Sequence, residues 1–187
     1  MMNYLDCYTP VRLDINPLVD INIFEELGTI RYSKLPKDIL KPSLLDILDN
    51  ANLPILNVIV WQWNLKVDQL NPPHTDGDLR NNKIARAAGL NWLIEGDSAL
   101  DFWNKDKLVP YYEEQPDIFY TAWSNQNNLL PEVTCTSFPA IVNPQIPHRV
   151  RSINGSTIRK SIVIYFKDNV SYEETRNRLS NYHDFII

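Results

Sequence analysis

The second two-thirds of the chain is a series of short segments rich in β-branched and aromatic residues, and this pattern limits the fold more than any other feature. Pro, Asn, Asp or Gly separates the segments, as expected for strands joined by turns. They are ILNVIVWQW, ARAAGLNWLIEG, ALDFW, DIFYTAW, EVTCTSFPAIVN, HRVRSI and RKSIVIYF. No long helical pattern lies between them, whereas parallel strands need such crossover connections. We therefore expect a mainly β fold, an antiparallel double sheet of jelly-roll type.

Two helices are expected outside this β region, one on each side of it. Residues 43–51, SLLDILDNA, carry leucines that form an apolar stripe, and Ser43 is a candidate N-cap. Ser171, with Glu174 three residues later, forms the S-x-x-E pattern of a capping box and marks a second helix after the last strand. These N- and C-terminal helices would flank and cover the sheets.

Composition narrows the class of protein. With 187 residues, 44% apolar and 22% charged, the chain has normal globular values, and we expect one domain over residues 1–187 with a jelly-roll core at about 55–167. A net charge of −5 argues against a nucleic-acid partner. No apolar run approaches the roughly 18 residues that span a bilayer. Cys7 and Cys135 lie far apart and the N-terminus lacks a signal-peptide pattern, so a reduced, cytoplasmic protein is expected.

The stretch LNPPHTDGD places His74 and Asp76 two positions apart. Side chains at i and i+2 of an extended chain point to the same side. An imidazole and a carboxylate that project together supply two of the three ligands in a 2-His-1-carboxylate site, which leaves positions open on an iron(II) ion. A second histidine is needed, and the chain has only three.

His148 is the better candidate for that ligand. It follows NPQIP at the start of a strand, far enough along the chain from Asp76 to return from the opposite side of a barrel. His183 belongs to the C-terminal NYHDFII, beyond the second helix, where a mobile tail or surface packing is the usual explanation. The expected metal ligands are therefore His74, Asp76 and His148.

The segment HRVRSINGSTIRKSIVIYF contains Asn154-Gly155, the strongest short signal for a hairpin turn. A two-residue turn there pairs His148 with Ser161. His148, Arg159 and Ser161 then share one face, because the side-chain period of a strand is two. An arginine that faces a sheet interior needs an anion, and its planar fork matches a carboxylate. A dicarboxylate would meet the metal at one end and Arg159 at the other.

In this order, the residues resemble the signature of the iron(II)- and 2-oxoglutarate-dependent dioxygenases, including their prolyl hydroxylase-like branch. The family pattern is H-x-D, a distant H, and an R-x-S roughly ten residues later. This chain has PHTD followed by PHRVRSINGSTIRKSIVIYF, with the HRV and the final aromatic F that are common in the family. Each piece is weak alone, whereas the ordered set, over about residues 55–167, is specific.

The resemblance implies a double-stranded β-helix of cupin-like build, with iron(II) held by His74, Asp76 and His148. Arg159 and Ser161 would bind the distal carboxylate of 2-oxoglutarate, whose keto-acid end chelates the metal, and O2 would be the co-substrate. The implied reaction is hydroxylation of an unactivated C–H bond, with 2-oxoglutarate converted to succinate and CO2. A peptidyl residue such as proline is the preferred substrate, slightly ahead of a free small molecule.

Some positions depart from relatives in the superfamily. Prolyl hydroxylase-like relatives carry a tyrosine on the strand before H-x-D, where this chain has Trp61 and Trp63. Asn91, on the following strand, is the substitute candidate for steadying 2-oxoglutarate, and an asparagine bonded to local backbone is the equal alternative. The nucleic-acid demethylases repeat an arginine six residues after the first. This chain has Tyr165 at that position, which argues against a nucleic-acid demethylase that acts in repair.

Other conspicuous residues have ordinary explanations. Most of the five tryptophans are expected in the core, with one or two in the wall of the substrate pocket. Arg80 and Arg86 are placed to meet an anionic substrate, but solvated charges on a loop are the more common case. Residues 104–117, NKDKLVPYYEEQPD, fit an active-site lid and an ordinary surface loop equally well.

Two other functions stay open at this stage. A jelly-roll with the same ligands would also suit a non-catalytic protein that binds a metal or a small acid, or a cupin-like metal hydrolase with a different metal. One scaffold of this kind hosts many chemistries, and its substrates range from small molecules to peptides and proteins.

Overall fold

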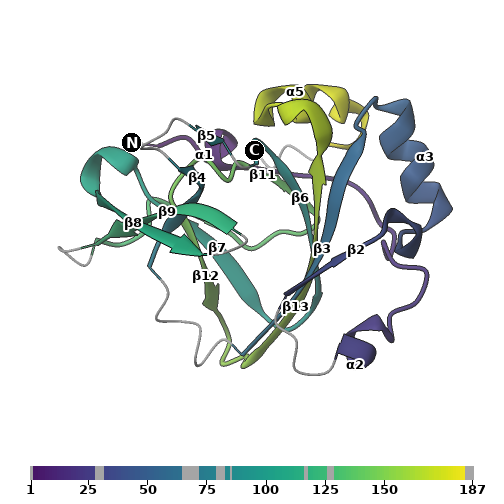
Figure 1. Cartoon of the computed structure of the whole chain (residues 1–187), viewed down its shortest axis with the longest axis horizontal. Helices are drawn as coiled ribbons and strands as arrows, with labels where there is room; N and C mark the ends of the chain where they lie inside the picture. Colours follow the sequence, from purple (N-terminus) through teal and green to yellow (C-terminus); the bar gives the residue numbers. More distant parts are fainter. Residues whose placement is uncertain are drawn as a thin grey trace.

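The computed structural model describes residues 2–27, 32–64, 72–78, 83–84, 86–115, 118–125 and 129–183. Within them, two antiparallel sheets face each other (Figure 1). The six-stranded sheet has the order β1 (Tyr8–Pro10), β11 (Ala140–Val142), β6 (Gly89–Glu95), β13 (Ile158–Phe166), β3 (Ile55–Asn64) and β2 (Tyr32–Leu35). The second sheet has the order β10 (Val133–Cys135), β7 (Ser98–Phe102), β12 (His148–Ser152), β4 (His74–Asp78), β9 (Ile118–Ser124) and β8 (Val109–Gln115), with β5 (Lys83–Ile84) against β4. The expected mainly β, jelly-roll fold is confirmed.

Helices flank the strands on the N- and C-terminal sides. They are α1 (Tyr4–Cys7), α2 (Ile23–Leu27), α3 (Pro42–Asn50) and α5 (Tyr172–Arg178), with short 3-10 turns η1 (Lys37–Ile39), η3 (Lys105–Lys107), η4 (Lys167–Asn169) and η5 (Ser180–Tyr182). The capping box is confirmed at its N-cap, because Ser171 Oγ accepts a hydrogen bond from the N–H of Glu174 at 3.1 Å. Ser43 is not a cap. Helix α3 begins at Pro42, whose missing N–H costs nothing in the first turn.

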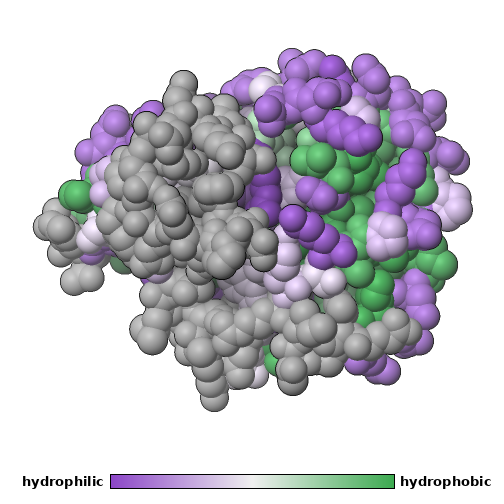
Figure 2. Space-filling view, viewed as in Figure 1, coloured by the Kyte–Doolittle hydropathy of each residue, from purple (hydrophilic) through white to green (hydrophobic). Residues whose placement is uncertain are grey.

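The largest hydrophobic core lies on the face of the six-stranded sheet that α3 and α5 cover. On β13, the even-numbered Ile162, Ile164 and Phe166 belong to this core, together with Leu44 and Leu48 of α3. In Figure 2, part of this apolar side reaches the surface in the region where Figure 1 shows β2 and α3. Odd-numbered residues of β13 therefore face the other sheet. Among the described residues, none of the helices has the length and apolar character of a membrane span.

The turn at Asn154-Gly155 forms, but the strands on either side of it do not pair with each other. Both residues have positive φ, 52° and 73°, as this kind of turn requires. Strand β12 pairs with β7 and β4, whereas β13 pairs with β3 and β6. The expected pairing of His148 with Ser161 is therefore wrong. The turn carries the chain from one sheet to the other.

A second crossing lies beside the first, in the connection from β6 to β7. Gly96 has a φ of 88°, and a Cβ on it would come within 1.8 Å of the carbonyl oxygen of Ile158, so this position requires glycine. The N–H of Ile153 donates to the carbonyl of Asp97 at 3.1 Å, which ties the two crossings together. The sandwich is thus closed at this end, and the inner faces of β12 and β13 lie opposite each other.

Residues 104–117 do not form a lid in the described part of this segment. They contain η3 and β8, and β8 is the terminal strand of the second sheet, paired along its length with β9. Residues 116 and 117 lie outside the described residues. The hairpin positions β9, which in turn pairs with β4 and so supports the strand that carries His74 and Asp76.

Candidate metal and anion site

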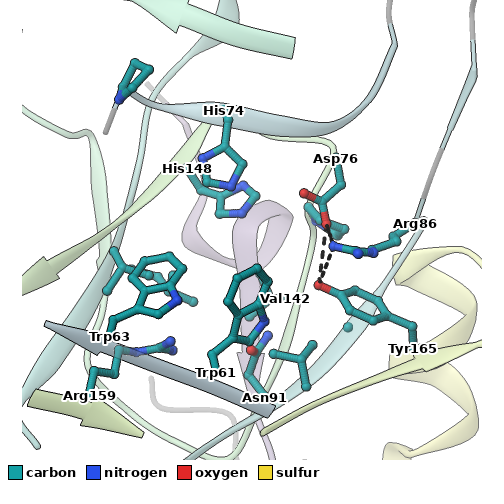
Figure 3. A pocket seen from close by; sticks show the side chains of 16 residues that line it. Trp61, Trp63, His74, Asp76, Arg86, Asn91, Val142, His148, Arg159 and Tyr165 are labelled. Carbon is teal, nitrogen blue, oxygen red and sulfur yellow. Dashed lines mark hydrogen bonds and ion pairs between the residues drawn. The ribbon is translucent and has the colours of Figure 1, made fainter. Parts of the chain in front are cut away.

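A cavity of about 280 Å³ lies between the two sheets, and its described lining residues come from both. At one end are His74, Asp76 and His148 of the second sheet (Figure 3). At the other end are Arg159 and Asn91 of the six-stranded sheet. The walls between the two ends are largely apolar. Such a cavity, with a few polar groups that converge on it, is the usual form of a small-ligand site.

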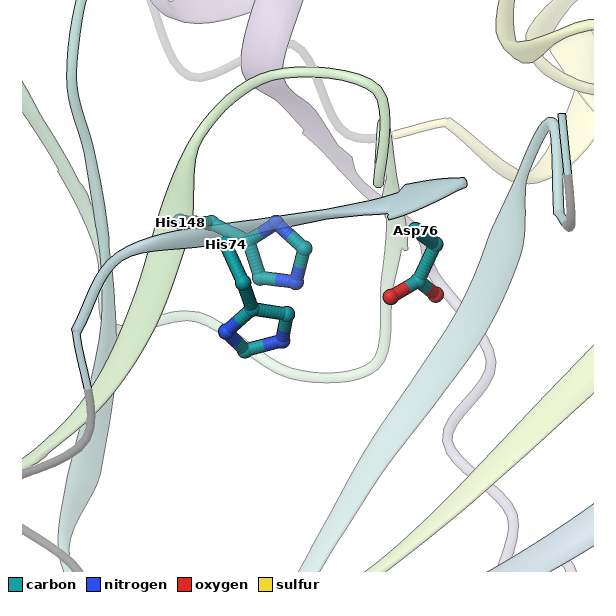
Figure 4. Close-up of side chains that lie close together, drawn as sticks. All are labelled: His74, Asp76 and His148. Carbon is teal, nitrogen blue, oxygen red and sulfur yellow. The ribbon is translucent and has the colours of Figure 1, made fainter. Parts of the chain in front are cut away.

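The three predicted metal ligands come together at one end of this cavity. His74 and Asp76 project to the same side of β4, as their spacing predicted (Figure 4). His148 lies directly opposite His74 in the ladder between β12 and β4, so it comes from the neighbouring strand and not from the opposite side of a barrel. One potential ligand atom from each residue lies within 4.8 Å of the others. That separation suits a single cation held by all three.

Hydrogen bonds to the backbone hold this end of the cavity in place. The N–H of Asp76 donates to the carbonyl of Pro144 at 2.8 Å, which links β4 to the turn that precedes His148. The amide of Gln145 donates to the backbone carbonyls of Asp76 at 2.5 Å and of Arg86 at 2.7 Å. Because these bonds join three separate segments, the ligand positions do not depend on β4 alone.

The surroundings of both histidines suit metal binding. Burial, followed by the neighbouring imidazole of His148, lowers the pKa of His74 to about 4, so His74 is neutral near pH 7. His148 Nδ1 lies 2.9 Å from the carbonyl oxygen of Ile146. A carbonyl can only accept, so Nδ1 donates this hydrogen bond, and Nε2 is the ring nitrogen left to bind a cation. Each ring therefore has a nitrogen that is able to bind a cation.

Asp76 is 4% exposed, and one of its carboxylate oxygens, Oδ2, accepts both of its side-chain hydrogen bonds. Arg86 Nη1 donates to Oδ2 at 3.2 Å and the Tyr165 hydroxyl donates to the same atom at 3.4 Å. The guanidinium also stacks on the Tyr165 ring, with 4.4 Å to the centroid. In Figure 3 the other carboxylate oxygen lies on the side of the histidines. Among the described residues, no donor reaches that second oxygen.

Arg86 is therefore not a solvated loop residue. Its side chain is 11% exposed and forms an ion pair with the buried carboxylate of Asp76. Burial by itself lowers the pKa of Arg86, but Tyr165 and Asp76 outweigh it and raise that pKa. The expectation of a solvated Arg86 is wrong, while Arg80 lies outside the described residues.

Arg159 occupies the far end of the cavity and is 3% exposed. Its Nε donates to Ser98 Oγ at 2.9 Å, and its Nη1 donates to Ser161 Oγ at 2.6 Å. No carboxylate of the described residues forms an ion pair with it. Burial lowers the pKa of Arg159 to about 10. The arginine thus stays charged at neutral pH and lacks an acidic partner within the described part of the chain.

The walls between the two ends carry Asn91, Trp61 and Trp63. Asn91 is 8% exposed, and its side chain makes no hydrogen bond to the described residues, which disfavours the local-backbone alternative. Trp61 and Trp63 stand edge to face, with 5.3 Å between ring centroids. The Trp63 ring lies 5.8 Å from the guanidinium carbon of Arg159. Two of the five tryptophans thus wall the cavity, as expected.

His183 stands apart from this site. It is 8% exposed and its backbone bridges Val11, so it is neither in a mobile tail nor on the surface. The cluster of potential metal ligands found among the described residues does not include it. The preference for His148 over His183 agrees with this placement.

The sequence does not predict several residues of the site. It marks Tyr165 only as a departure from the nucleic-acid demethylases, it gives no indication for Ser98 or Gln145, and it predicts a solvated Arg86. These residues lie far apart in the sequence and carry no motif, although the i, i+2 pattern of β13 places Tyr165 on the same face as Arg159 and Ser161.

Comparisons with known proteins add little to this geometry. No protein-family model and no curated protein sequence matches the chain. One similar solved structure is a crystal structure of Fe(II) HppE, with 12% identity, a TM-score of 0.33, and coverage of 59% of this chain and 42% of HppE. Another is acireductone dioxygenase from Bacillus anthracis with a cadmium ion in its active centre, with 13% identity, a TM-score of 0.31, and coverage of 87% and 94%. These likenesses are too distant to bear on function.

Proposed function

We propose that this protein is an iron(II)- and 2-oxoglutarate-dependent dioxygenase that hydroxylates an unactivated C–H bond. The observation that carries the proposal is the pairing of two complementary sites in one cavity. A group of His74, Asp76 and His148 lies at one end, and a buried arginine without a carboxylate partner lies at the other. A dianion with a metal-chelating end and a distal carboxylate complements both.

The residues at the metal end fit iron(II) by their chemistry. Two imidazoles and one carboxylate form the facial set that leaves coordination positions open for other ligands. The Ile146 carbonyl fixes the tautomer of His148, and Arg86 with Tyr165 holds Asp76. Bound iron(II), with O2 and 2-oxoglutarate, would supply the oxidation, in which the C–H bond becomes C–OH and 2-oxoglutarate becomes succinate and CO2.

The residues at the anion end would bind the distal carboxylate. Arg159 offers a charged planar fork, which Ser161 and Ser98 hold in place through their hydroxyl groups. The Trp63 ring packs beside the guanidinium. Asn91 is the proposed neutral donor along the body of 2-oxoglutarate. Each of these groups would orient the co-substrate, so that its keto-acid end meets the metal.

A peptidyl residue such as proline is the proposed substrate class, with a free small molecule as the alternative. The apolar walls of Trp61, Val142 and Leu100 suit an aliphatic group better than a charged one. Incubation with proline-containing peptides and with small aliphatic acids, followed by mass spectrometry for a gain of one oxygen atom, compares the two classes directly.

Turnover of the co-substrate tests the proposal without knowledge of the substrate. Metal-free protein supplied with iron(II), O2 and 2-oxoglutarate should form succinate, and withdrawal of iron(II) should stop it. His74→Ala and Asp76→Ala should abolish the reaction. Iron-independent succinate formation, or 2-oxoglutarate that fails to bind in the presence of iron(II), would rule the proposal out.

Succinate formation and thermal stability together separate the other candidate functions. A non-catalytic binding protein would gain thermal stability from the metal and the acid without forming succinate. A cupin-like hydrolase would gain stability from a metal such as zinc and would be indifferent to 2-oxoglutarate. The identity of the metal that co-purifies gives a first indication.

A further inference from the structure

Asp76, one of the three predicted metal ligands, forms a buried ion pair with Arg86. The two charged groups lie 3.2 Å apart, with side chains 6% and 11% exposed. Gln145 holds the backbone of both residues through one amide group, and the Tyr165 ring covers the guanidinium. These contacts join four segments of the chain, so the pair is not a chance approach of a mobile side chain.

This pair changes the charge that a cation would meet. The charged residues among the described lining of the cavity are Asp76, Arg86 and Arg159. Arg86 offsets the single carboxylate, and Arg159 leaves the cavity with a net charge of about +1. A divalent cation alone therefore enters a positive cavity.

A dianion reverses this balance. It brings two negative charges into a cavity lined by buried side chains, where charges interact more strongly than in solvent. The dianion removes the repulsion that the cation meets, and a bound cation adds to the attraction that the dianion meets. Because linkage is reciprocal, each should raise the affinity of the cavity for the other by the same factor.

We propose that Arg86 makes cation binding at His74, Asp76 and His148 depend on an anionic ligand in the same cavity. Arg86 does so by neutralising Asp76 through Oδ2 while it leaves the other oxygen directed to the histidines. It is a positioning and charge-setting residue, since it acts through Asp76. The inference rests on the proposed function for the identity of the dianion, and on the cavity geometry for everything else.

Cobalt(II) titration of the metal-free full-length protein tests this proposal. The dissociation constant of cobalt(II), followed by visible absorbance, is measured with no addition, with 2-oxoglutarate and with succinate. Succinate carries the two charges without the keto group, so it reports charge coupling apart from chelation. In the wild-type protein, both acids should tighten cobalt(II) binding, by roughly 10- to 100-fold for 2-oxoglutarate and less for succinate.

Arg86→Gln should bind cobalt(II) more tightly than the wild-type protein when no acid is present, because Asp76 then keeps its full charge. The gain from succinate should shrink correspondingly. Arg86→Lys should keep most of the coupling, because it keeps the charge. Arg151→Gln is the matched control: it removes an arginine from buried Asp101 of the same sheet, outside the cavity lining, and should leave both cobalt(II) constants unchanged.

Two results would overturn the proposal. One is an Arg86→Gln variant that binds cobalt(II) with the wild-type affinity or more weakly. The other, which needs no variant and so survives a folding defect, is a wild-type protein whose cobalt(II) affinity is indifferent to both acids. Failure of the proposed function looks different, because coupling would then be present without any formation of succinate from 2-oxoglutarate.

Discussion

Two arginines line the same cavity in different electrostatic surroundings. Arg86 lies beside a carboxylate that it neutralises, and its pKa is raised, whereas Arg159 has only hydroxyl partners among the described residues and a lowered pKa. Both are largely buried. Burial alone therefore does not mark an arginine as part of a ligand site. Arg159 is the one that indicates a ligand site, because a buried guanidinium without an anionic partner is costly unless a ligand supplies the anion.

The largest expected effect is on stability, where replacement of Arg86 and replacement of Arg159 should change the free energy of unfolding in opposite directions. Arg86→Met should lower the free energy of unfolding of the metal-free protein by about 3 kcal/mol, since it leaves the buried Asp76 carboxylate without its partner. Arg159→Met should raise the same quantity by about 1–2 kcal/mol, since it removes an unpaired buried charge. Urea denaturation in the absence of ligands measures both values. If both variants lost stability equally, the contrast between the two arginines would fail.

The second effect concerns affinity for the acid. Arg159→Gln should weaken 2-oxoglutarate binding by about 100-fold, the cost of losing a charge-assisted bidentate pair. Cobalt(II) binding without acid should not weaken, because Arg159 is remote from the three ligands. Isothermal titration gives both constants. A parallel loss of cobalt(II) affinity would show that the substitution had disturbed the whole cavity.

A smaller loss is expected from the hydroxyl groups that hold Arg159. Ser161→Ala removes the acceptor at 2.6 Å from Nη1, and should weaken 2-oxoglutarate binding by about 10-fold. Ser98→Ala, which removes the acceptor for Nε, should behave similarly. Comparison of kcat and KM separates this role from catalysis, because KM for 2-oxoglutarate should rise while kcat changes little. An unchanged KM would show that the serines do not orient the guanidinium.

The smallest effect is expected at His183, outside the cavity. Burial, followed by Arg176, lowers its pKa below the ordinary value of 6.5. The unfolded state then binds more protons as the pH falls below that value, so His183 should contribute a slight decrease in wild-type stability from pH 7 to pH 5. His183→Gln should reduce this decrease in Tm and leave the affinities for metal and acid unchanged. Loss of cobalt(II) binding in this variant would contradict the assignment of His148 as the ligand.

The sequence predicted the parts of this molecule that depend on local periodicity. The strand-like segments, the capping box at Ser171 and the common direction of His74 and Asp76 follow from side-chain periods and from hydrogen bonds within a few residues. Interactions within such short stretches leave little freedom, so they can be deduced from one chain alone. The fold class followed from the same local pattern.

What failed depended on partners far away in the sequence. Asn154-Gly155 specifies a tight turn, and the N–H of Ser156 indeed donates to the carbonyl of Ile153 at 3.0 Å. The turn does not determine whether its flanking strands pair with each other. Here β12 pairs with β7 in one sheet and β13 pairs with β3 in the other. The face shared by His148 and Arg159 was thus inferred from the wrong pairing, although both side chains do line one cavity.

Arg86 shows the same limit at the level of charge. Nothing in the residues around it distinguishes it from a solvated arginine, because its partners Asp76 and Tyr165 come from other strands. Its role depends on the close approach of β6 and β13, where Gly89 has no side chain. A Cβ there would lie 3.0 Å from Tyr165 Cε1, so any larger residue would press on the ring that supports the guanidinium.

The division of the cavity between the two sheets has a mechanical consequence. His74, Asp76 and His148 belong to one sheet, while Arg159 and Ser161 belong to the other, and the chain crosses between the sheets at Asn154-Gly155. A molecule held at both ends acts as a strut across the sandwich. Its length would set the spacing of the layers, and its departure would let them slide or separate, which amide hydrogen exchange along β4 and β13 would register together.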